Sequence, residues 1–498
     1  MRLQGVCIGI SYTLLQGMEN PEIKDIVYDS RKVSKGVMFV CLTGAETDGH
    51  KYIPEAVEKG ASVIVIEREE AAAGIPENVT VIKVGSSRYA LALMSAAFFG
   101  YPDRKLTTIG VTGTKGKTTT TYGIRNILEK AVLKTGVIGT IGVTVGDTVI
   151  SSDNTTPESY DIHKHMAWMV SEGCRYVVME VSSQGLKLDR TAGIVFDIGV
   201  FTNLTSDHIG KREHADFDEY LQCKSKLFRQ CRTGVVNIDD SHADRILEGH
   251  TCDVVTLSTE KDADVTATDI EFLNEAGRLG MRFRTCGRIS CDVKIYIPGR
   301  FSVYNALTSA AVCSCLGISE EAIVSGLEST RVKGRVEMIP VSPDFSVIID
   351  YAHNEASTRS VLETLLQYEP KRLIAVFGCG GNRSRVRRYD IGEVAGELAD
   401  LSILTSDNPR FEKVEDINND IKIGMAKHDG KYIEIEDRKE AIAYAITHAR
   451  PGDMIVMLGK GHEDYIETEG VKRHFSEHEA IMEIMQEIRD GKRRMSAG

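Results

Sequence analysis

A glycine-rich stretch at residues 109–120, IGVTGTKGKTTT, constrains the fold of this chain more than any other feature. The apolar run at residues 106–111 predicts a buried strand, and helix-forming residues at 122–130 follow the glycines. A strand, a tight glycine turn and a helix start form a cradle for phosphate, because glycines let backbone N–H groups approach the oxygens and the helix dipole favours negative charge. The stretch therefore predicts a nucleotide-binding α/β domain.

Individual side chains of this cradle have expected roles. Lys117 is expected to reach the terminal phosphates, and Thr118 or Thr119 to offer a hydroxyl to Mg²⁺. The spacing is the shorter G-x-x-G-K-T form, since Val111 stands where the strict P-loop pattern has its first glycine. An ordinary Gly/Thr turn would also fit the string alone, and the strand and helix around it favour the cradle. The predicted nucleotide-binding residues here are Gly113, Thr114, Lys115, Gly116, Lys117, Thr118 and Thr119.

The length of 498 residues is too great for one hydrophobic core and suggests about three domains. We expect an N-terminal α/β domain at residues 1–102. A central ATP-binding domain with a P-loop ATPase-like parallel sheet is expected at 103–334. Residues 335–498 again alternate strands and helices, and they predict a Rossmann-like domain that lacks the G-x-G-x-x-G fingerprint.

Charge and composition exclude several classes of protein. The net charge of −12 argues against a nucleic-acid-binding protein, because a broad acidic surface repels phosphates. The eleven cysteines include no C-x-x-C pair and are expected to be reduced thiols. No apolar run approaches the ~20 residues of a membrane span. We therefore expect a cytoplasmic protein with no membrane or nucleic-acid partner. The expected oligomeric state is a monomer.

Acidic residues follow two strands expected in the central domain. Glu180 ends the apolar run at 177–179, and the next strand, at 194–202, is followed by Asp207 and His208. The carboxyl ends of parallel strands gather ligands, so Glu180 is a natural ligand for Mg²⁺ near a phosphate cradle. An Asp-His pair considered alone is more often a loop hydrogen bond than a metal site.

A lysine lies on the inward face of a helix expected at residues 217–231. The apolar residues there follow a 3.6-residue period, Lys224 falls on their stripe, and Lys226 faces away. An inward lysine commonly snorkels or pairs with an acid. The other interpretation is a desolvated, neutral amine that can do chemistry.

A series of short motifs, in this order along nearly the whole chain, resembles the Mur ligase family. The motifs are residues 29–31 (DSR), 113–119, 155–157 (TTP), 179–183 (MEVSS), 203–205 with 207–208, Lys224, Asn305, 334–335 (GR), 350–353 (DYAH), 407–410 (DNPR) and 459–463 (GKGHE).

The resemblance implies a role for each matching residue around the first substrate. Ser30 would lie beside the uridine, so the domain at residues 1–102 would bind the UDP-linked substrate. Thr155 and Thr156 would hold the muramoyl dipeptide. Ser182 and Arg190 would bind its phosphate and peptide parts. The family's equivalent of Lys224 is carbamylated, and with His208 it would help to place a second Mg²⁺. A carbamate requires an unprotonated amine, which agrees with the inward position of Lys224.

The resemblance also implies contacts from the last third of the chain. Asn305 is similar to the family's adenine contact, and Arg335, Asp350 and His353 are similar to its nucleotide contacts. The box at 407–410 is typical of enzymes that add meso-diaminopimelate. Its arginine would hold a carboxylate through a bidentate fork, while Asp407 and Glu463 would receive an ammonium. The implied amino-acid site is Arg383, Asp407, Asn408, Arg410, Gly459 and Glu463.

The activity implied is ATP-dependent formation of an amide bond in peptidoglycan synthesis. Meso-diaminopimelate would be joined to UDP-N-acetylmuramoyl-L-alanyl-D-glutamate through an acyl phosphate, with ATP and Mg²⁺ as cofactors. The implied catalytic residues are Lys117, Glu180, His208 and Lys224.

The sequence also departs from the family pattern, and these departures keep alternatives open. Gln184 replaces a usual histidine, the loop at 209–217 is longer with His214 as a possible substitute for the family's histidine, and residues 354–356 read NEA. The alternatives are a lysine-adding or other-acceptor Mur ligase, a folylpolyglutamate synthetase, and a nucleotide-binding relative that has lost catalysis. A simple P-loop kinase would leave the Rossmann-like last third unexplained.

Overall fold

The computed structural model describes residues 1–44, 47–206, 209–210, 213–275 and 278–495. The chain forms two compact units. The first contains Met1–Thr266 and Thr308–Ala322, and the second contains Ala267–Leu307 and Ile323–Gly498. The domain boundaries at 102/103 and 334/335 stay a prediction.

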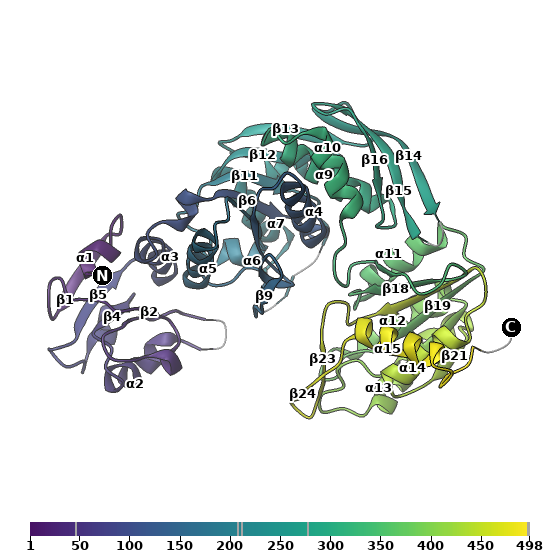
Figure 1. Cartoon of the computed structure of the whole chain (residues 1–498). Coiled ribbons are helices and arrows are strands. Elements are labelled where there is room, and N and C mark those ends of the chain that lie inside the picture. Colours follow the sequence, from purple (N-terminus) through teal and green to yellow (C-terminus); the bar gives the residue numbers. More distant parts are fainter. Residues whose placement is uncertain (45–46, 207–208, 211–212, 276–277, 496–498) are drawn as a thin grey trace. The chain divides into compact units, whose positions relative to one another are not determined.

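The first unit begins with a small five-stranded sheet whose strands are short and mostly apolar (Figure 1). The edge strand β1 is antiparallel to β5, and the other pairs are parallel. Strand β4 has the sequence VIVI and all four side chains are buried, because apolar cores lie on both faces of the sheet. The strand order is β1 (Tyr12–Gln16), β5 (Thr80–Val84), β4 (Val63–Ile66), β3 (Met38–Val40) and β2 (Ile26–Val27), with helices α1 (Leu3–Val6), α2 (Ile53–Glu58) and α3 (Ser87–Phe98).

The larger sheet of the first unit carries the predicted cradle. Its strands are parallel from β13 to β7, and a hairpin of β8 and β9 adds antiparallel strands. The order is β13 (Asp253–Ser258), β12 (Cys231–Asn237), β11 (Phe196–Phe201), β6 (Thr107–Thr112), β10 (Tyr176–Glu180), β7 (Thr135–Gly139), β8 (Gly142–Val145) and β9 (Thr148–Ile150). The helices are α4 (Lys117–Lys130), α5 (Ser159–Ser171), α6 (Ser183–Lys187), α7 (Phe217–Ser225) and α8 (Ala243–Ile246).

Two predicted helix bounds are wrong. Helix α4 begins at Lys117, five residues before the predicted start, because Gly116 in the left-handed region (φ 84°) turns the chain directly into the helix. Helix α7 ends at Ser225, and a 3₁₀ turn follows at Lys226–Arg229. Cys231, which we expected to be helical, opens β12 and pairs with Phe196 of β11.

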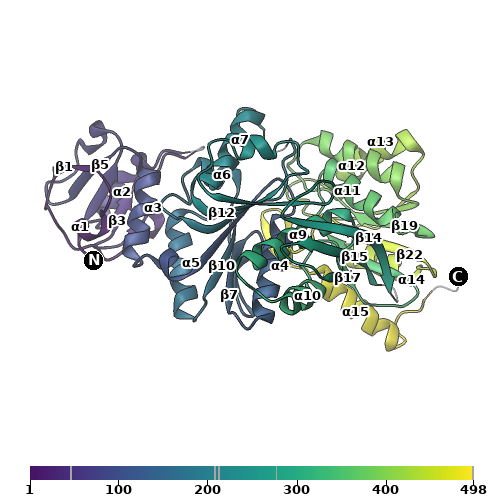
Figure 2. The same ribbon diagram turned by 90° about the horizontal axis from the view of Figure 1, so that it is seen from above.

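The second unit contains a six-stranded sheet with helices on both faces, as the Rossmann-like prediction required (Figure 2). Only β17 is antiparallel to its neighbour. The order is β17 (Glu337–Ile339), β18 (Ser346–Asp350), β22 (Asp453–Leu458), β19 (Arg372–Phe377), β20 (Leu401–Leu404) and β21 (Tyr432–Glu434). One side carries α11 (Glu355–Leu366), α12 (Arg385–Leu398) and α13 (Val414–Met425), and the other carries α14 (Arg438–Thr447) and α15 (Glu477–Arg489).

The remaining elements complete the chain. Strand β14 (Val265–Glu275) pairs with β13 through its first two residues, and β15 (Arg278–Gly287) is antiparallel to β16 (Asp292–Ile295). Helices α9 (Arg300–Cys315) and α10 (Glu320–Ser329) follow, and β23 (Tyr465–Thr468) forms a hairpin with β24 (Val471–His474). All eleven cysteines are free. In the ranges described above, no helix is both long and apolar enough to cross a membrane.

Candidate functional site

The predicted cradle is a strand, a turn and a helix, with Lys117 as the first residue of α4. Its Nζ donates to the carbonyl oxygens of Gly113 (2.9 Å) and Thr114 (3.1 Å). A Cβ on Gly113 would lie 1.9 Å from Oγ1 of Thr202, so glycine is needed there for close packing as well as for its φ of 150°. The turn therefore leads directly into a helix N-terminus, the end of a helix that favours an anion.

The tip of the turn is held from the end of β11. The amide of Lys115 donates to Oδ1 of Asn203 (2.9 Å), and Nδ2 of Asn203 donates back to the Lys115 carbonyl (3.0 Å). Oγ1 of Thr202 donates to the same carbonyl (2.7 Å). Lys115 itself is exposed, and Thr119 is half-buried in the first turn of α4. The turn is therefore fixed before any nucleotide binds.

Glu180 at the end of β10 lies next to the cradle. Its side chain is buried, with 1% exposed, and it accepts hydrogen bonds from Oγ1 of Thr118 (3.1 Å), the amide of Thr140 (3.0 Å) and Oγ1 of Thr140 (3.1 Å). A carboxylate and a threonine hydroxyl side by side at a phosphate cradle are oxygen donors of the kind that Mg²⁺ prefers. The residues present therefore fit a magnesium ion.

Lys224 is buried on α7, as its period predicted, with 1% exposed. Its Nζ donates to the Gly113 carbonyl (2.8 Å) and lies 4.6 Å from the ring centroid of Tyr220. Lys226 is exposed and donates to the Leu186 carbonyl (3.2 Å). Helix α7 thus places the amine of Lys224 next to the backbone of the cradle, at Gly113.

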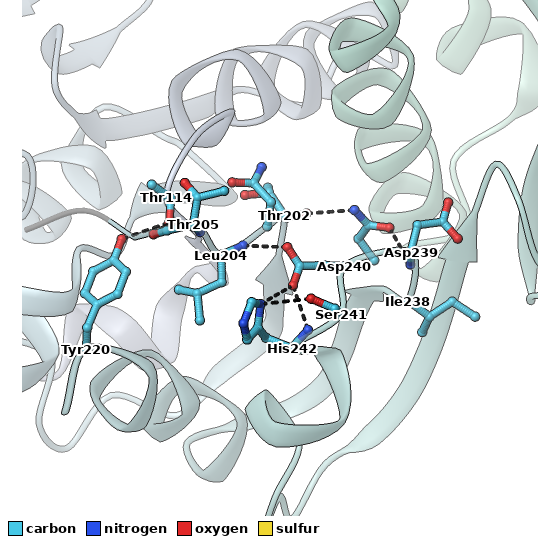
Figure 3. A network of polar contacts seen from close by, with 12 residues as sticks. Thr114, Thr202, Leu204, Thr205, Tyr220, Ile238, Asp239, Asp240, Ser241 and His242 are labelled. Atoms are coloured by element: carbon cyan, nitrogen blue, oxygen red, sulfur yellow. Dashed lines mark hydrogen bonds and ion pairs between the residues drawn. The ribbon is translucent and has the colours of Figure 1, made fainter. Parts of the chain in front are cut away.

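A network of polar contacts fixes the loop that follows β11 (Figure 3). The hydroxyl of Tyr220 lies 2.9 Å from Oγ1 of Thr114, and that oxygen accepts from the amide of Thr205 (3.0 Å). From the end of β12, Asp240 accepts from the amide of Leu204 (2.7 Å). The loop leading to residues 207 and 208 is therefore anchored on both sides.

The predicted residues for the muramoyl dipeptide come together beyond β10. Oγ1 of Thr156 donates to the Glu180 carbonyl (2.9 Å) and lies 3.0 Å from Oγ of Ser182, while Oγ1 of Thr155 lies 3.1 Å from that of Thr140. Arg190 donates to the Thr156 carbonyl (2.8 Å), and its Nε is buried with no hydrogen-bond partner among the described residues. These side chains adjoin Glu180.

Arg190 is also linked to the small sheet. Its guanidinium pairs with Glu158 (2.8 Å), and Glu158 pairs with Arg88 of α3 (3.3 Å). Ser30, which we expected beside the uridine, is buried in a short 3₁₀ turn (Ser30–Lys32). Its neighbour Asp29 caps this turn, and hydrogen bonds from Arg31 lower the pKa of that carboxyl.

The predicted nucleotide residues of the second unit form a cluster around Tyr351. The guanidinium of Arg335 lies 4.9 Å from the Tyr351 ring centroid, and the rings of His353 and His462 each lie 4.7 Å from it. Burial lowers the pKa of His353, and burial together with Arg335 lowers that of His462 to about 4, so both imidazoles are neutral at pH 7. Asn305 is buried on α9.

Asp350, another member of this group, is also buried. Its oxygens accept from the amides of Val336 and Ala352 (both 2.7 Å), and burial raises its pKa. These bonds hold the chain before β17 and the chain after β18, so the carboxyl already has a structural task.

The predicted amino-acid residues converge where β19, β20 and β22 end. NH1 of Arg410 donates to the Gly381 carbonyl (2.8 Å), and its Nε pairs with Glu467 (3.2 Å). Nδ2 of Asn408 donates to Glu463 (2.9 Å). A Cβ on Gly459 would lie 2.5 Å from Oδ2 of Asp407, so these loops touch. Arg383 is exposed after β19.

His208 and Asp207 lie outside the described residues, so their part in a metal site stays a prediction. Elsewhere, over the ranges that the structure describes, no three His, Cys, Asp or Glu side chains gather as a metal site. Thr118 and Lys224 are outside those residue types. A magnesium site at the cradle would therefore need the Thr118 hydroxyl and a modified Lys224 amine as ligands, in addition to the Glu180 carboxylate.

Sequence reasoning missed Thr140, Tyr220 and Asp240. Asp240 follows the end of a parallel strand, the same signal that identified Glu180, and could have been found that way. Tyr220 was visible only as a member of the apolar stripe of α7. Thr140 carried no signal in the sequence. His214, named as a substitute for the family's histidine, is buried with its Nε2 2.9 Å from Oγ of Ser183.

The three family domains match in order along the chain. The domain described as Mur ligase family, catalytic domain matches residues 22–99. The Mur ligase middle domain matches residues 111–313, and the domain described as Mur ligase, glutamate ligase domain matches residues 334–461.

Full-length relatives are also similar. The UDP-N-acetylmuramoyl-L-alanyl-D-glutamate--2,6-diaminopimelate ligase 1 of Clostridium acetobutylicum is 42% identical over 98% of this chain and 100% of its own. The corresponding ligase of Caldanaerobacter subterraneus is 41% identical over 98% and 99%.

Solved structures of Mur ligases and related enzymes share the fold of this chain. A structure titled as a UDP-N-acetylmuramoyl-L-alanyl-D-glutamate--2,6-diaminopimelate ligase superposes with a TM-score of 0.68, at 28% identity, over 95% of this chain and 96% of that one. A folylpolyglutamate synthase from Thermotoga maritima, at 19% identity and a TM-score of 0.60, covers only 74% of this chain and 90% of its own, and shows the shared fold alone. With 42% identity along 98% of its length, this chain belongs to the Mur ligase family.

Proposed function

We propose that this protein is an ATP-dependent, ADP-forming ligase that adds meso-diaminopimelate to UDP-N-acetylmuramoyl-L-alanyl-D-glutamate in peptidoglycan synthesis. The observation that carries the proposal is full-length similarity, at 38–42% identity, to curated relatives with that name. The Asp407–Arg410 loop, with its arginine held beside Gly381, supports the choice of amino acid.

The first step transfers the γ-phosphoryl group of ATP to the substrate's glutamyl carboxylate and gives an acyl phosphate and ADP. Lys117 and the amides at the start of α4 would bind the phosphates, with Gly113, Thr114, Lys115, Gly116 and Thr119 shaping the turn. Bound Mg²⁺ supplies charge neutralisation on the phosphates. Thr118 and Glu180 would hold one ion, and a carbamylated Lys224 with His208 would help to place a second.

In the second step the amine of the amino acid attacks the acyl carbonyl, phosphate leaves and an amide forms. No side chain becomes a covalent nucleophile, so the protein acts by positioning and charge stabilisation. Ser30, Thr155, Thr156, Ser182 and Arg190 would position the UDP-linked substrate. Nε of Arg190 has no hydrogen-bond partner among the described residues and would donate to that substrate.

The amino acid would be held in the second unit. Arg410 and Arg383 would take its carboxylates, and Asp407, Asn408, Gly459 and Glu463 would surround an ammonium. Lysine lacks the distal carboxylate and would lose the charge-assisted hydrogen bonds to that group, which is a strong basis for rejection. Asn305, Arg335, Asp350 and His353 would bind the nucleotide from this unit.

The test is a panel of amino acids supplied with ATP and the UDP-linked dipeptide, scored by product mass and by phosphate release. We expect product with meso-diaminopimelate and at least about 100-fold less with lysine, since a site built to hydrogen-bond a substrate group discriminates strongly against an analogue that lacks it. Product with lysine alone would overturn the specificity. ATP bound without amide from any amino acid would indicate a non-catalytic relative.

A further inference from the structure

Arg438 and Glu477 form an ion pair that is completely shielded from solvent, with 0% of either side chain exposed. Nε and NH2 of Arg438 donate to Oε1 of Glu477 (3.0 and 2.7 Å). Arg438 is the first residue of α14 and Glu477 is the first residue of α15. Neither residue belongs to the amino-acid site described above, and such a pair is costly to bury.

The other donors of Arg438 show what the pair touches. NH1 donates to the carbonyl of Ser406 (2.8 Å), the residue before Asp407. NH2 donates to the carbonyl of Leu458 (2.8 Å), the residue before Gly459. One guanidinium therefore joins the ends of β20 and β22, which are separated in the sheet by β19.

These strand ends open into the loops of the proposed amino-acid site. A Cβ on Gly378, directly after β19, would lie 2.0 Å from the Thr405 carbonyl, and one on Gly459 would lie 2.5 Å from Oδ2 of Asp407. Packing this close transmits small shifts, because interiors are dense and leave no slack. A displacement of the Ser406 or Leu458 carbonyl would move Asp407 and Gly459 with it.

The pair also belongs to the charge pattern of the site. Lys460 is fully buried, and its Nζ lies 3.2 Å from both Oδ1 of Asn408 and Oε2 of Glu463. Oε2 of Glu477 accepts no hydrogen bond from any described residue. Burial raises the pKa of Glu477. The charges of Arg438 and Lys460 lower this pKa, and the charge of Asp407 raises it, so the Glu477 carboxyl interacts electrostatically with charged groups of the pocket.

We propose that the Arg438–Glu477 pair positions the amino-acid pocket, by fixing the ends of β20 and β22 from which Asp407 and Gly459 extend. The inference rests on the proposed function of that pocket and adds two positioning residues to it. Glu477 orients the guanidinium, and the guanidinium holds the two carbonyls. The pair thereby determines how well the pocket binds diaminopimelate in preference to lysine.

The test replaces the pair by apolar residues of similar size, in the double variant Arg438→Met, Glu477→Leu. Such replacements often preserve stability because they remove two buried charges together. The two carbonyls lose their donor, so the KM for diaminopimelate should rise at least about tenfold, while the KM values for ATP and the UDP-linked dipeptide stay within about twofold. The preference for diaminopimelate over lysine should fall in parallel.

A second variant and a matched control separate positioning from folding. Glu477→Gln keeps the size of the side chain, and a rise of at least about threefold in the KM for diaminopimelate is expected even if the double variant does not fold. The control is Arg372→Met, Asp453→Leu, which removes an ion pair between β19 and β22 at their opposite ends. It should lower the melting temperature, because Asp453 also accepts from the amide of Arg450 (2.7 Å), and it should leave the KM for diaminopimelate unchanged.

The inference is overturned if folded variants of the pair keep the wild-type KM for diaminopimelate, if all three KM values rise together, or if the control has the same effect. A wild-type enzyme that makes no product from diaminopimelate would instead refute the proposed function. The two failures are therefore distinguishable in one set of assays.

Discussion

Lys224 on α7 donates a 2.8 Å hydrogen bond to the carbonyl of Gly113, the first glycine of the phosphate cradle. The two residues are far apart in the sequence, and the bond fixes the inward lysine under the turn that is expected to bind ATP. Its position beside the Tyr220 ring removes it further from water. The amine is therefore held where a small change in its charge would act on the nucleotide.

Replacing Lys224 by alanine should abolish most activity. We expect a fall of at least about 100-fold in kcat, comparable to the loss of one electrostatic contact in an active site. Added short-chain carboxylic acids should restore part of the rate if a carbamate normally supplies a carboxylate there. The exposed Lys226 offers a matched control, and Lys226→Ala should stay active. A fully active Lys224→Ala variant would rule out the carbamate.

The loop after β11 should depend on Asp240 and not on its neighbour Asp239. Asp240 accepts from the amides of Leu204 (2.7 Å) and His242 (2.9 Å), whereas Asp239 bonds to Ser258 and Thr259. Asp240→Ala should reduce kcat about tenfold and cost about 1–3 kcal/mol of unfolding free energy, because a buried amide loses its acceptor.

The control is Asp239→Ala, measured by the same rate assay and by denaturant unfolding. It should lower stability and leave kcat within about twofold, since it anchors β13 and not the loop. Equal losses of kcat in the two variants would show that the Asp240 contact has no special part in the site.

Arg410→Lys should weaken the choice of amino acid. A lysine cannot reproduce the fork that reaches the Gly381 carbonyl and Glu467 at once. We expect kcat/KM for diaminopimelate to fall at least about tenfold, with a smaller change for lysine. Competition assays with both amino acids measure the ratio directly. An unchanged ratio would remove Arg410 from the basis of specificity.

Acid should destabilise the first unit through His163. This residue on α5 is 1% exposed, neither ring nitrogen has a hydrogen-bond partner among the described residues, and burial lowers its pKa to about 4. Below its ordinary pKa the unfolded chain takes up a proton that the folded chain refuses. Stability is therefore lost as pH falls from about 6.5 to about 4, by about 3 kcal/mol in total.

The measurement compares wild type with His163→Leu by denaturant unfolding across this window. The buried carboxyl of Asp103 lies 3.9 Å from Nδ1 of His163, and burial raises its pKa. As pH falls, Asp103 takes up a proton in the folded state before it does in the unfolded state, so Asp103 stabilises the fold while His163 destabilises it. Both proteins contain Asp103, and the difference between their unfolding free energies therefore reports the contribution of His163. If the unfolding free energies of wild type and His163→Leu differed by the same amount at pH about 7.5 and at about 4.5, the low pKa assigned to His163 would be wrong.

Local patterns were enough for the elements and for part of the site. The glycine spacing at 113–116 predicted the cradle because its backbone conformations need glycine, and an acid after an apolar strand predicted Glu180 beside it. The period of α7 predicted a buried Lys224. Each of these signals depends only on residues that are near one another along the chain.

Other parts of the site depend on residues from distant elements. No pattern in the sequence pairs Thr140 with Glu180, Asp240 with Leu204, or Arg438 with the carbonyls that precede Asp407 and Gly459. These contacts exist because parallel strands place their ends at one edge of a sheet, whatever their order in the chain.

By itself the sequence determined the alternation of strands and helices, the turn for phosphate and the succession of family motifs, since these follow from local conformation and residue type. Only the tertiary structure decided which partners hold Lys224, Glu180 and the amino-acid loops. Hydrogen bonds and burial are properties of residues brought together across the fold, and their energies depend on that shared environment.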